Sequence, residues 1–456
     1  MSDAFAPGSN PGLSVSAAPV TSAPASAALT PDPAPDPHLV PPEALEPQGV
    51  WASIVGQRPV VERLARIASA PGGKGIAQSW LVCGPPGSGR SNVARAFAAA
   101  LECPNHGCGE CRVCRQVLAG THPDLTVLAT NKVTISIDEV RALVETSEQM
   151  PSVAPWRIII IEDVDRMVER TTNVLLKEIE EPADHTIWLL CAPSANDVLP
   201  TIRSRTRLVT LAVPTDQAVA RFLTENVAFL RQRGKDRKVV TRIVSPNSPE
   251  GVDAERLDPK VAARCARIAQ GHIGLARLYA VDSEVLQARD RLISGVLGMS
   301  VTSDAVLLAD TVVSDANAQA EQEATRSVER AQREFRRING LDESDRVPPN
   351  LRGAYNAIGK KDEIKRLTTR RSRDVLDRCL NDIASIYRDV AVLQNGAQQT
   401  VGLVNLEYRD RIAALSGRLS RQAALDRLDR VELTRKRLNG NVTALLAFEA
   451  LLASLI

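Results

Sequence analysis

The sequence lacks an excess of charge of either sign and lacks a long apolar run. Its 56 lysine and arginine residues nearly balance 54 aspartate and glutamate residues, so the net charge gives no reason to expect the whole chain to bind nucleic acid. No run approaches the roughly 18 apolar residues of a membrane helix, and the N-terminus has no basic stretch followed by an apolar core. We therefore expect a cytoplasmic protein with no membrane segment, in which any basic surface is local.

Cysteine is sparse, with eight residues, and disulfides are not expected because the cytoplasm keeps thiols reduced. Four of the eight lie together in the stretch CPNHGCGECRVC, with the spacing CxxxxCxxCxxC. Two consecutive CxxC spacings can bring thiolates round one ion at tetrahedral angles. The spacing predicts one structural zinc ion held by Cys103, Cys108, Cys111 and Cys114. Two alternatives are His106 in place of one cysteine, and four buried free thiols.

At 456 residues the chain is too long for one ordinary domain, and its texture changes along its length. Residues 1–47 contain 11 of the 28 prolines, and such a segment cannot bury enough apolar surface to offset its ordering entropy. Apolar runs then alternate with amphipathic stretches, which predicts strands and helices around a mostly parallel sheet. After about residue 212 we expect the strand signals to fade and helices to dominate, with polar stretches around 231–258 and 340–360.

A glycine-rich turn, GPPGSGRS at residues 84–91, lies between a predicted strand and a predicted helix. It matches the phosphate-binding pattern GxxxxGK[ST] except that Arg90 replaces the lysine. Backbone N–H groups can converge on an anion at such a helix N-terminus, here near Ser91. Arginine lacks the compact ammonium group of lysine that reaches between phosphates. We therefore expect fast hydrolysis to be lost, whereas nucleotide binding could survive. The glycines of this turn are Gly84, Gly87 and Gly89. The alternative interpretation is a glycine-rich turn that binds no ligand.

Acidic residues follow the isoleucine-rich run in IIIIEDVDRM, namely Glu162, Asp163 and Asp165. A strand tip is where a magnesium-holding acid and a water-activating acid belong, but the usual Asp-Glu order is reversed here. The exchange moves each carboxylate by about 1.5 Å, which matters where atoms must be positioned to within about 1 Å. Together with Arg90 it predicts a degraded catalytic site, and the alternative is an exposed acidic cap on a core strand.

The order of these motifs resembles that of the bacterial clamp-loader subunits of the AAA+ class over about residues 51–282. The resemblance is carried by IVGQRPVVERL, GPPGSGRS, the cysteine cluster, GTHPDL, IIIIEDVDRM, NVLLKEIEEP and LPTIRSRTR. It implies an α/β P-loop AAA+ core with a zinc module, a small helical lid and an all-α C-terminal collar that forms oligomers. The domains so implied are a disordered tail at 1–48, the core at 49–211, the lid at 212–282 and the collar at 283–456.

The resemblance also implies a role in DNA replication, in which the clamp loader of DNA polymerase III loads a sliding clamp onto primed DNA. The partners implied are the tau/gamma and delta subunits, the sliding clamp, and primer-template DNA through the complex. The ATP-hydrolysing tau/gamma subunit of this family keeps lysine and Asp-Glu, so Arg90 and Glu162-Asp163 imply a vestigial nucleotide site. The chain itself would then have no polymerase activity and little or no ATPase activity. The alternatives are an active AAA+ motor subunit and a zinc-containing scaffold.

Arginines in the stretch IRSRTR offer a way to act on a neighbour's ATP. Clamp loaders carry a Ser-Arg-Cys motif whose arginine reaches the γ-phosphate of the adjacent subunit, and Ser204-Arg205-Thr206 stands in its place. The resemblance therefore implies that Arg205 is an arginine finger that acts in trans. An ordinary surface arginine is the alternative. Where the family has a second sensing arginine, this sequence offers only Gly274 with Arg277.

Two arginine-rich stretches fall in the C-terminal half, EATRSVERAQREFRR at residues 323–337 and KKDEIKRLTTRRSR at residues 360–373. They are either a DNA-facing surface or solvated helices stabilised by i,i+4 ion pairs. The scarcity of aromatic residues there favours solvated helices. The last stretch, NVTALLAFEALLASL, resembles the final helix of the collar and is apolar nearly all round. We expect it to be buried against partner subunits or, alternatively, within its own domain.

Overall fold

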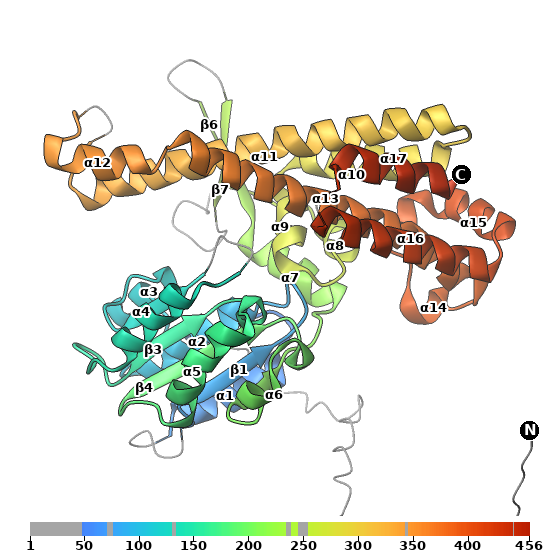
Figure 1. The fold of residues 1–456 in the computed structure, drawn as a ribbon. Helices are drawn as coiled ribbons and strands as arrows, with labels where there is room; N and C mark the ends of the chain where they lie inside the picture. The colour runs from blue at the N-terminus through green and yellow to red at the C-terminus, as the bar shows by residue number, and fades with distance from the viewer. Residues whose placement is uncertain are drawn as a thin grey trace, which may run out of the picture. The chain divides into compact units, whose positions relative to one another are not determined.

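The computed structural model describes residues 48–456 except 71–75, 130–133, 234–238, 245–253, 343–344 and 441. The tail expected at residues 1–48 lies outside the described residues, apart from Gln48. Figure 1 shows the order of the elements along the chain.

A five-stranded, all-parallel sheet forms the first part of the chain, with strand order β2-β3-β4-β1-β5. Its strands are β1 (Ser79–Cys83), β2 (Leu125–Leu128), β3 (Arg157–Ile161), β4 (Thr186–Ala192) and β5 (Arg207–Thr210). Every residue of β1, β3 and β4 is buried, as the apolar runs predicted, because helices cover both faces. Successive residues face opposite sides, so Ile158 and Ile159 belong to different core clusters.

The helices of this part pack on the two faces of the sheet (Figure 1). They are η1 (Gly49–Trp51), α1 (Arg58–Ala68), α2 (Arg90–Glu102), α3 (Arg112–Ala119), α4 (Ile137–Ser147), η3 (Val164–Arg166), α5 (Glu169–Glu180), η4 (Ala195–Asp197) and α6 (Pro200–Arg203). The start of α4 shows why the chain turns helical there. Ser136 accepts a hydrogen bond from the Glu139 N–H, and the Glu139 carboxylate accepts one from the Ser136 N–H at 2.8 Å. The parallel α/β core predicted from the sequence is therefore confirmed.

The next segment combines three helices with a small antiparallel sheet of strand order β7-β6-β8. Its elements are α7 (Asp216–Asn226), β6 (Ala228–Arg233), β7 (Val239–Val244), β8 (Glu255–Arg256), α8 (Pro259–Ile268) and α9 (Ile273–Val281). The expectation of a helical lid is therefore wrong for residues 228–233, 239–244 and 255–256, which form strands. The run VVTRIV at 239–244 is rich in β-branched residues, which pair better along an extended strand than they pack in a helix.

The C-terminal part is helical, and its described residues contain no strand. Its helices are α10 (Ser283–Gly298), α11 (Thr302–Ile338), α12 (Pro349–Ala357), α13 (Lys361–Gln394), α14 (Gln398–Val401), η6 (Leu406–Tyr408), α15 (Arg409–Arg418), α16 (Arg421–Asn439) and α17 (Ala444–Leu455). The two longest, α11 and α13, pack along each other (Figure 1). Among the described helices, none combines the length and apolar character needed to cross a membrane.

The last helix, α17, is buried by its own chain. It packs on α11 and α16, and Phe448 and Leu452 are fully buried in the same core cluster as side chains of those helices. Leu446, 60% exposed, lies on the outer side of the helix. The sequence left two expectations for this apolar stretch, and the structure agrees with burial within its own domain. The reason is that α11 and α16 supply apolar surface along most of the helix.

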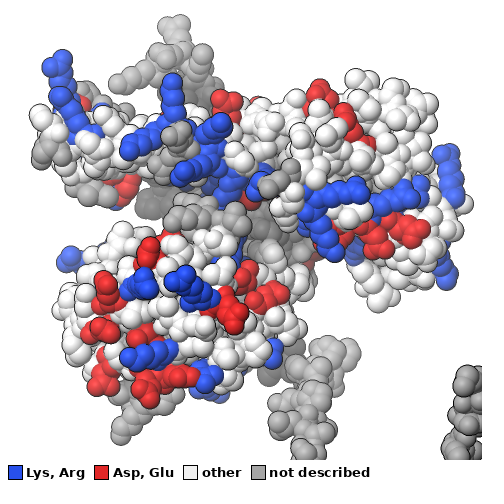
Figure 2. Space-filling view, in the orientation of Figure 1, with Lys and Arg blue, Asp and Glu red and all other residues white. Residues whose placement is uncertain are grey.

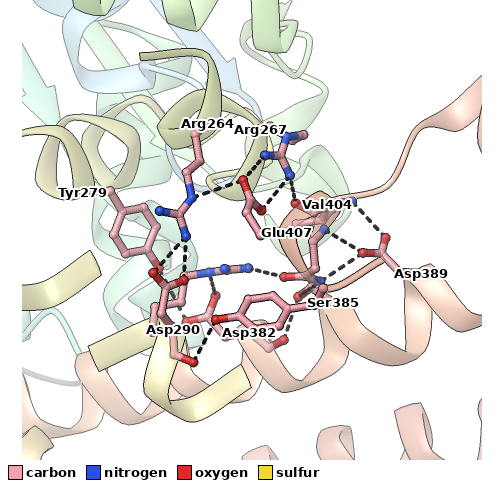
Figure 3. A network of polar contacts seen from close by, with 12 residues as sticks. Arg264, Arg267, Tyr279, Asp290, Asp382, Ser385, Asp389, Val404 and Glu407 are labelled. Carbon is pink, nitrogen blue, oxygen red and sulfur yellow. Dashed lines mark hydrogen bonds and ion pairs between the residues drawn. The ribbon is translucent and has the colours of Figure 1, made fainter. Parts of the chain in front are cut away.

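A buried polar network joins the α8–α9 segment to the C-terminal helices (Figure 3). Arg289 of α10, 3% exposed, donates through Nε to Asp382 of α13 at 2.8 Å and through Nη2 to Asn405 at 2.6 Å. The hydroxyl of Tyr279 in α9 donates to Asp382 at 3.5 Å. Burial raises the pKa of Asp382, while the Arg289 guanidinium opposes that shift. At the margin of this network Arg264 of α8 pairs with Asp290 at 2.7 Å, which fixes the segment further.

Candidate functional site

The glycine-rich turn lies between β1 and α2, as the pattern predicted. Gly87 and Gly89 have φ angles of 80° and 92°, in the left-handed region that favours glycine. A Cβ on Gly84 would lie 2.6 Å from Ser88 Oγ and 2.8 Å from Leu211 Cβ, so there is no space for a side chain. The first-turn N–H groups of a helix have no partner within the helix, and α2 begins at Arg90 with Ser91 in that turn. The backbone therefore keeps the form of an anion-binding loop.

The side chain of Arg90 folds back over this loop. Its Nη1 donates to the Gly84 carbonyl, and its Nη2 lies 3.4 Å from Asp163 Oδ1. The side chain is only 14% exposed. The guanidinium thus donates its hydrogen bonds to groups of the protein itself. It does so at the place where a nucleotide's phosphates would need a free cation.

The two acids that follow β3 are also paired with arginines. Glu162 Oε1 lies 3.3 Å from Arg95 Nη2, and Asp163 Oδ2 lies 3.2 Å from Arg166 Nη2. A magnesium ion is held by carboxylate oxygens and by phosphates. In this chain the carboxylate oxygens of these two acids already face three guanidinium groups, those of Arg90, Arg95 and Arg166. The third acid, Asp165, has its pKa raised, chiefly by burial.

The sequence did not single out His272, which lies against the turn. His272 caps α9, where its Nδ1 accepts the Leu275 N–H at 3.1 Å. A Cβ on Gly87 would lie 2.2 Å from His272 Cγ, so the imidazole rests directly on this glycine. The Ile273 N–H also donates to the Gly87 carbonyl at 3.2 Å. Burial lowers the pKa of His272, and the positive charge of Arg90 acts in the same direction.

The local signal for His272 was the stretch QGHIGLARL, which we interpreted only for Gly274 and Arg277. Both of those residues are exposed on α9. The histidine could not be found from spacing alone, because it reaches the turn from a segment far along the chain. Only the packing of α9 against the turn brings it there.

Arg205 lies at the surface, where α6 ends and before β5 begins. Its side chain is 39% exposed, and its Nε pairs with Glu180. Its Nη1 donates to the Thr201 carbonyl at 3.0 Å and to Ser204 Oγ at 3.3 Å. Ser204 in turn donates to the same carbonyl at 3.1 Å. These contacts occupy Nε and Nη1 of the guanidinium, which stays at the surface.

The neighbouring arginines have other partners. Arg203 Nη1 donates to Asn196 Oδ1 at 3.1 Å, and the guanidinium carbon of Arg207 lies 5.2 Å from the centre of the Trp80 ring. The three arginines of the stretch IRSRTR therefore have different partners. Arg205 is the one oriented by Ser204.

The four cysteines come together as their spacing predicted, and their ligand atoms all lie within 4.8 Å of one another. The Sγ of Cys103 is 3.7 Å from the Sγ atoms of both Cys108 and Cys111. A tetrahedral ion with bonds of about 2.3 Å places its sulfur ligands about 3.8 Å apart. His106 lies elsewhere, with Nδ1 3.1 Å from the Ala68 carbonyl. The cluster therefore fits a metal ion held by four sulfurs, the fourth being Cys114.

Backbone geometry and charge prepare this cluster for a cation. Gly107 and Gly109 have φ angles of 98° and 82°, which turn the chain between the ligands. Burial acts to raise the pKa of Cys103, but N–H groups of Cys108 and other nearby residues outweigh it and lower that pKa to about 6. Burial raises the pKa of Cys114, and the neighbouring thiols add to this rise. Four thiolates this close need a cation to be ionised together.

Comparisons with known proteins point to one family. A sequence profile described as "DNA polymerase III, delta subunit" matches residues 56–215. DNA polymerase III subunit delta' of Pseudomonas aeruginosa is 36% identical over 135 residues, which cover 28% of this chain and 41% of that protein. The delta' subunit of Escherichia coli is 32% identical over 178 residues, covering 38% and 52%. DNA polymerase III subunit tau of Bacillus subtilis is 28% identical over 175 residues, covering 37% and 30%.

The matched segments span about half or less of the length of each of these relatives. Both delta' and tau subunits are among them, so the similarity leaves the type of subunit open. Residues 56–215 are therefore similar to subunits of DNA polymerase III of the delta' and tau types.

Proposed function

We propose that the chain is the delta prime subunit of the DNA polymerase III clamp loader, which helps to load the sliding clamp onto primed DNA during replication. The observation that carries this proposal is the position of Arg90, whose guanidinium is bound to the Gly84 carbonyl and to Asp163. A subunit that hydrolyses ATP needs a cation free for the phosphates and acids free for magnesium. In this chain the cation and the acids neutralise one another.

The nucleotide site is a vestige in this proposal. A triphosphate entering the turn would have to displace Arg90 from two partners and move the His272 ring from Gly87. Magnesium would have to compete with Arg95 and Arg166 for Glu162 and Asp163. Weak binding of nucleotide or of its magnesium complex is compatible with these contacts, and rapid turnover is not. The chain is then no ATPase and no polymerase by itself.

Arg205 is proposed to complete an ATP site on the adjacent tau/gamma subunit. The Arg205 side chain is 39% exposed, whereas that of Arg90 is 14% exposed. At the surface Arg205 would exchange its ion pair with Glu180 for a neighbour's γ-phosphate and neutralise charge on the phosphate oxygens. The partners proposed are the tau/gamma and delta subunits, the sliding clamp, and primer-template DNA through the complex. Residues 283–456 would form the collar of this hetero-oligomer in the cytoplasm.

The metal at the four-cysteine cluster is proposed to be a single structural zinc ion. Four sulfur ligands leave no position open for water, which is typical of structural and not catalytic zinc. The ion would hold the chain between α2 and α3 in place. The nearby Val50 N–H donates to the Gly107 carbonyl at 3.0 Å, so the segment that precedes α1 rests on this module.

A second candidate function is an active motor subunit of the tau/gamma type. It is favoured by the intact turn glycines and by the tau relative. The two candidates differ in what the purified chain does with ATP, so a nucleotide titration beside a steady-state hydrolysis assay decides between them. Turnover near 1 s⁻¹, the low end of the usual enzyme range, that disappears in Ser91→Ala would establish the motor. Assembly with tau/gamma and delta subunits without such turnover would support the delta prime subunit.

A further inference from the structure

The positive charge of the chain is concentrated in the arm formed by the end of α11, α12 and the start of α13. Residues 323–373 hold 14 lysines and arginines against 8 acids, whereas the rest of the chain holds 42 against 46. The arm therefore carries a net charge of +6 on a chain of net charge +2. Figure 2 shows Lys and Arg side chains gathered over this arm.

Four arginines of α11 form a line, which we call the arginine stripe, and they are Arg326, Arg330, Arg333 and Arg337. Their spacing of i, i+4, i+7 and i+11 places them on one face of the helix, over a length of about 16.5 Å. The opposite face meets the rest of the arm. There Val328 and Gln332 lie beside Gly359, and the Phe335 ring lies 5.8 Å from the Tyr355 ring. The arginine stripe therefore points away from the chain, and all four members are exposed.

The ion pairs that the sequence suggested for this helix are mostly absent from the described side chains. Arg337 pairs with Glu334 at 2.6 Å, three residues away, and Arg371 of α13 lies 3.8 Å from Glu323. Within the described part of the chain, Arg326, Arg330 and Arg333 have no ion pair. On α11, the i,i+4 pairs expected from the sequence are thus not found among the described side chains, and three guanidinium groups remain in water. Exposed pairs of this kind contribute at most about 1 kcal/mol, so they would yield readily to a ligand.

A groove continues the basic surface beside the stripe. It is a cavity of about 630 Å³ between α11, α13, the end of α16 and the start of α17. Its lining includes the cations Lys361, Lys365 and Arg373 and the acids Glu321 and Asp377. Arg435, also in the lining, is already paired with Asp377 at 2.6 Å. The three cations of α13 therefore extend the charge of the arm along the side of the hairpin.

This surface has the chemistry of a phosphate-backbone site and lacks that of a protein interface. Among the described residues, none of the large exposed apolar side chains lies between Leu307 and Val401, so the arm offers no apolar anchor of the kind that dominates protein interfaces. Backbone phosphates need only charge and hydrogen-bond donors, and 11 of the 14 cations are arginines, whose planar fork suits phosphate. Single strands bind by base stacking on aromatic rings. The rings of Phe335 and Tyr355 instead pack against each other, with centres 5.8 Å apart and planes tilted by 60°.

We propose that the arm binds the phosphate backbone of duplex DNA without sequence preference, and that the arginine stripe makes the main contact. A length of about 16.5 Å covers about five phosphates at the spacing of about 3.4 Å per strand. The inference does not depend on whether the nucleotide site is active, because it uses residues of a different part of the chain.

The test uses the full chain and a fluorescent duplex of mixed sequence, titrated at several salt concentrations. The stripe variant carries Arg326→Gln, Arg330→Gln, Arg333→Gln and Arg337→Gln, and it should fold normally because these side chains are exposed. We expect binding at low salt to weaken more than about tenfold, and the slope of log K against log salt to fall by about 3 to 4, at about 0.9 per phosphate contact. Four arginine-to-lysine exchanges at the same positions should keep most of the slope.

The matched control removes the same charge elsewhere, at four exposed arginines of α1, α4 and α15, namely Arg63, Arg141, Arg409 and Arg418. It should bind like the unaltered chain. Equal loss in the control would reduce the effect to net charge, and unchanged binding in the stripe variant would overturn the proposal. Tighter binding to a single strand would reject the duplex assignment. Competition by polyglutamate as strong as by DNA would assign the surface to an acidic protein instead.

Discussion

The Nη2 atom of Arg90 lies 3.4 Å from the Oδ1 atom of Asp163. The pair spans the carboxyl ends of β1 and β3, which are separated in the sheet by β4. It therefore connects the glycine turn to the acids that would hold magnesium, and it does so without a nucleotide. The first prediction follows from this contact.

The isolated chain should hydrolyse ATP far more slowly than about 1 s⁻¹. Arg90→Lys alone should not restore turnover, because Glu162 stays paired with Arg95 and the acids keep their reversed order. Steady-state phosphate release from the purified chain measures this, with Ser91→Ala as the background. Turnover gained by the single Arg90→Lys exchange would contradict the role given to the acids.

Removal of the His272 ring should strengthen nucleotide binding. His272→Ala takes away the side chain that rests on Gly87 and would leave that part of the turn open to phosphate. The gain should be of several fold in Kd, measured by titration with a fluorescent ATP analogue. Lys260→Ala, an exposed change on α8, is the control and should have no effect. Equal affinities for all three proteins would show that the histidine does not block the turn.

Arg205→Ala should lower the DNA- and clamp-stimulated ATPase of the reconstituted loader while zinc content and assembly stay unchanged. Arginine fingers contribute about 10³ to 10⁵ in rate, although several ATP sites in one complex would dilute the loss. Arg205→Lys should rescue little, because lysine lacks the planar fork. Arg203→Ala and Arg207→Ala are the controls, since those arginines contact Asn196 and Trp80. If either control slowed the loader while Arg205→Ala did not, the finger would be misassigned.

The purified chain should contain one zinc ion, lost in the double variant Cys111→Ser and Cys114→Ser. Elemental analysis measures the content, and Cys379→Ser, outside the cluster, should retain the metal. Structural zinc can contribute about 10 to 16 kcal/mol of apparent binding energy in small modules, so the double variant should also melt at a lower temperature. Retention of zinc by the double variant would show that other residues hold it.

Phe448→Ala in α17 should destabilise the C-terminal helices by about 3 to 5 kcal/mol, because it leaves a cavity in a closely packed core. Leu446→Ala, on the exposed side of the same helix, should change the free energy of unfolding by less than about 0.5 kcal/mol. Denaturant unfolding followed by circular dichroism compares the two. If the Phe448→Ala chain were stable but failed to assemble with partner subunits, we would conclude that this helix contacts a partner subunit.

The sequence alone was sufficient for features that depend on neighbours along the chain. Continuous apolar runs predicted the buried strands β1, β3 and β4, because only strands covered on both faces are apolar at every position. The CxxC spacings predicted the cysteine cluster, because short loops fix how close their ends can come. The strands β6 and β7 were missed because strand propensity is weak and depends on the partner strand.

Tertiary structure decided which distant groups meet. His272 reaches Gly87 and Arg90 reaches Asp163 only because the whole chain packs so as to bury its apolar surface. The apolar pattern of α17 showed that the helix must be buried, but it could not say which surface covers it, since burial is non-directional. Local spacing fixes short-range geometry through covalent bonds, whereas contacts between distant segments depend on the summed packing of all elements.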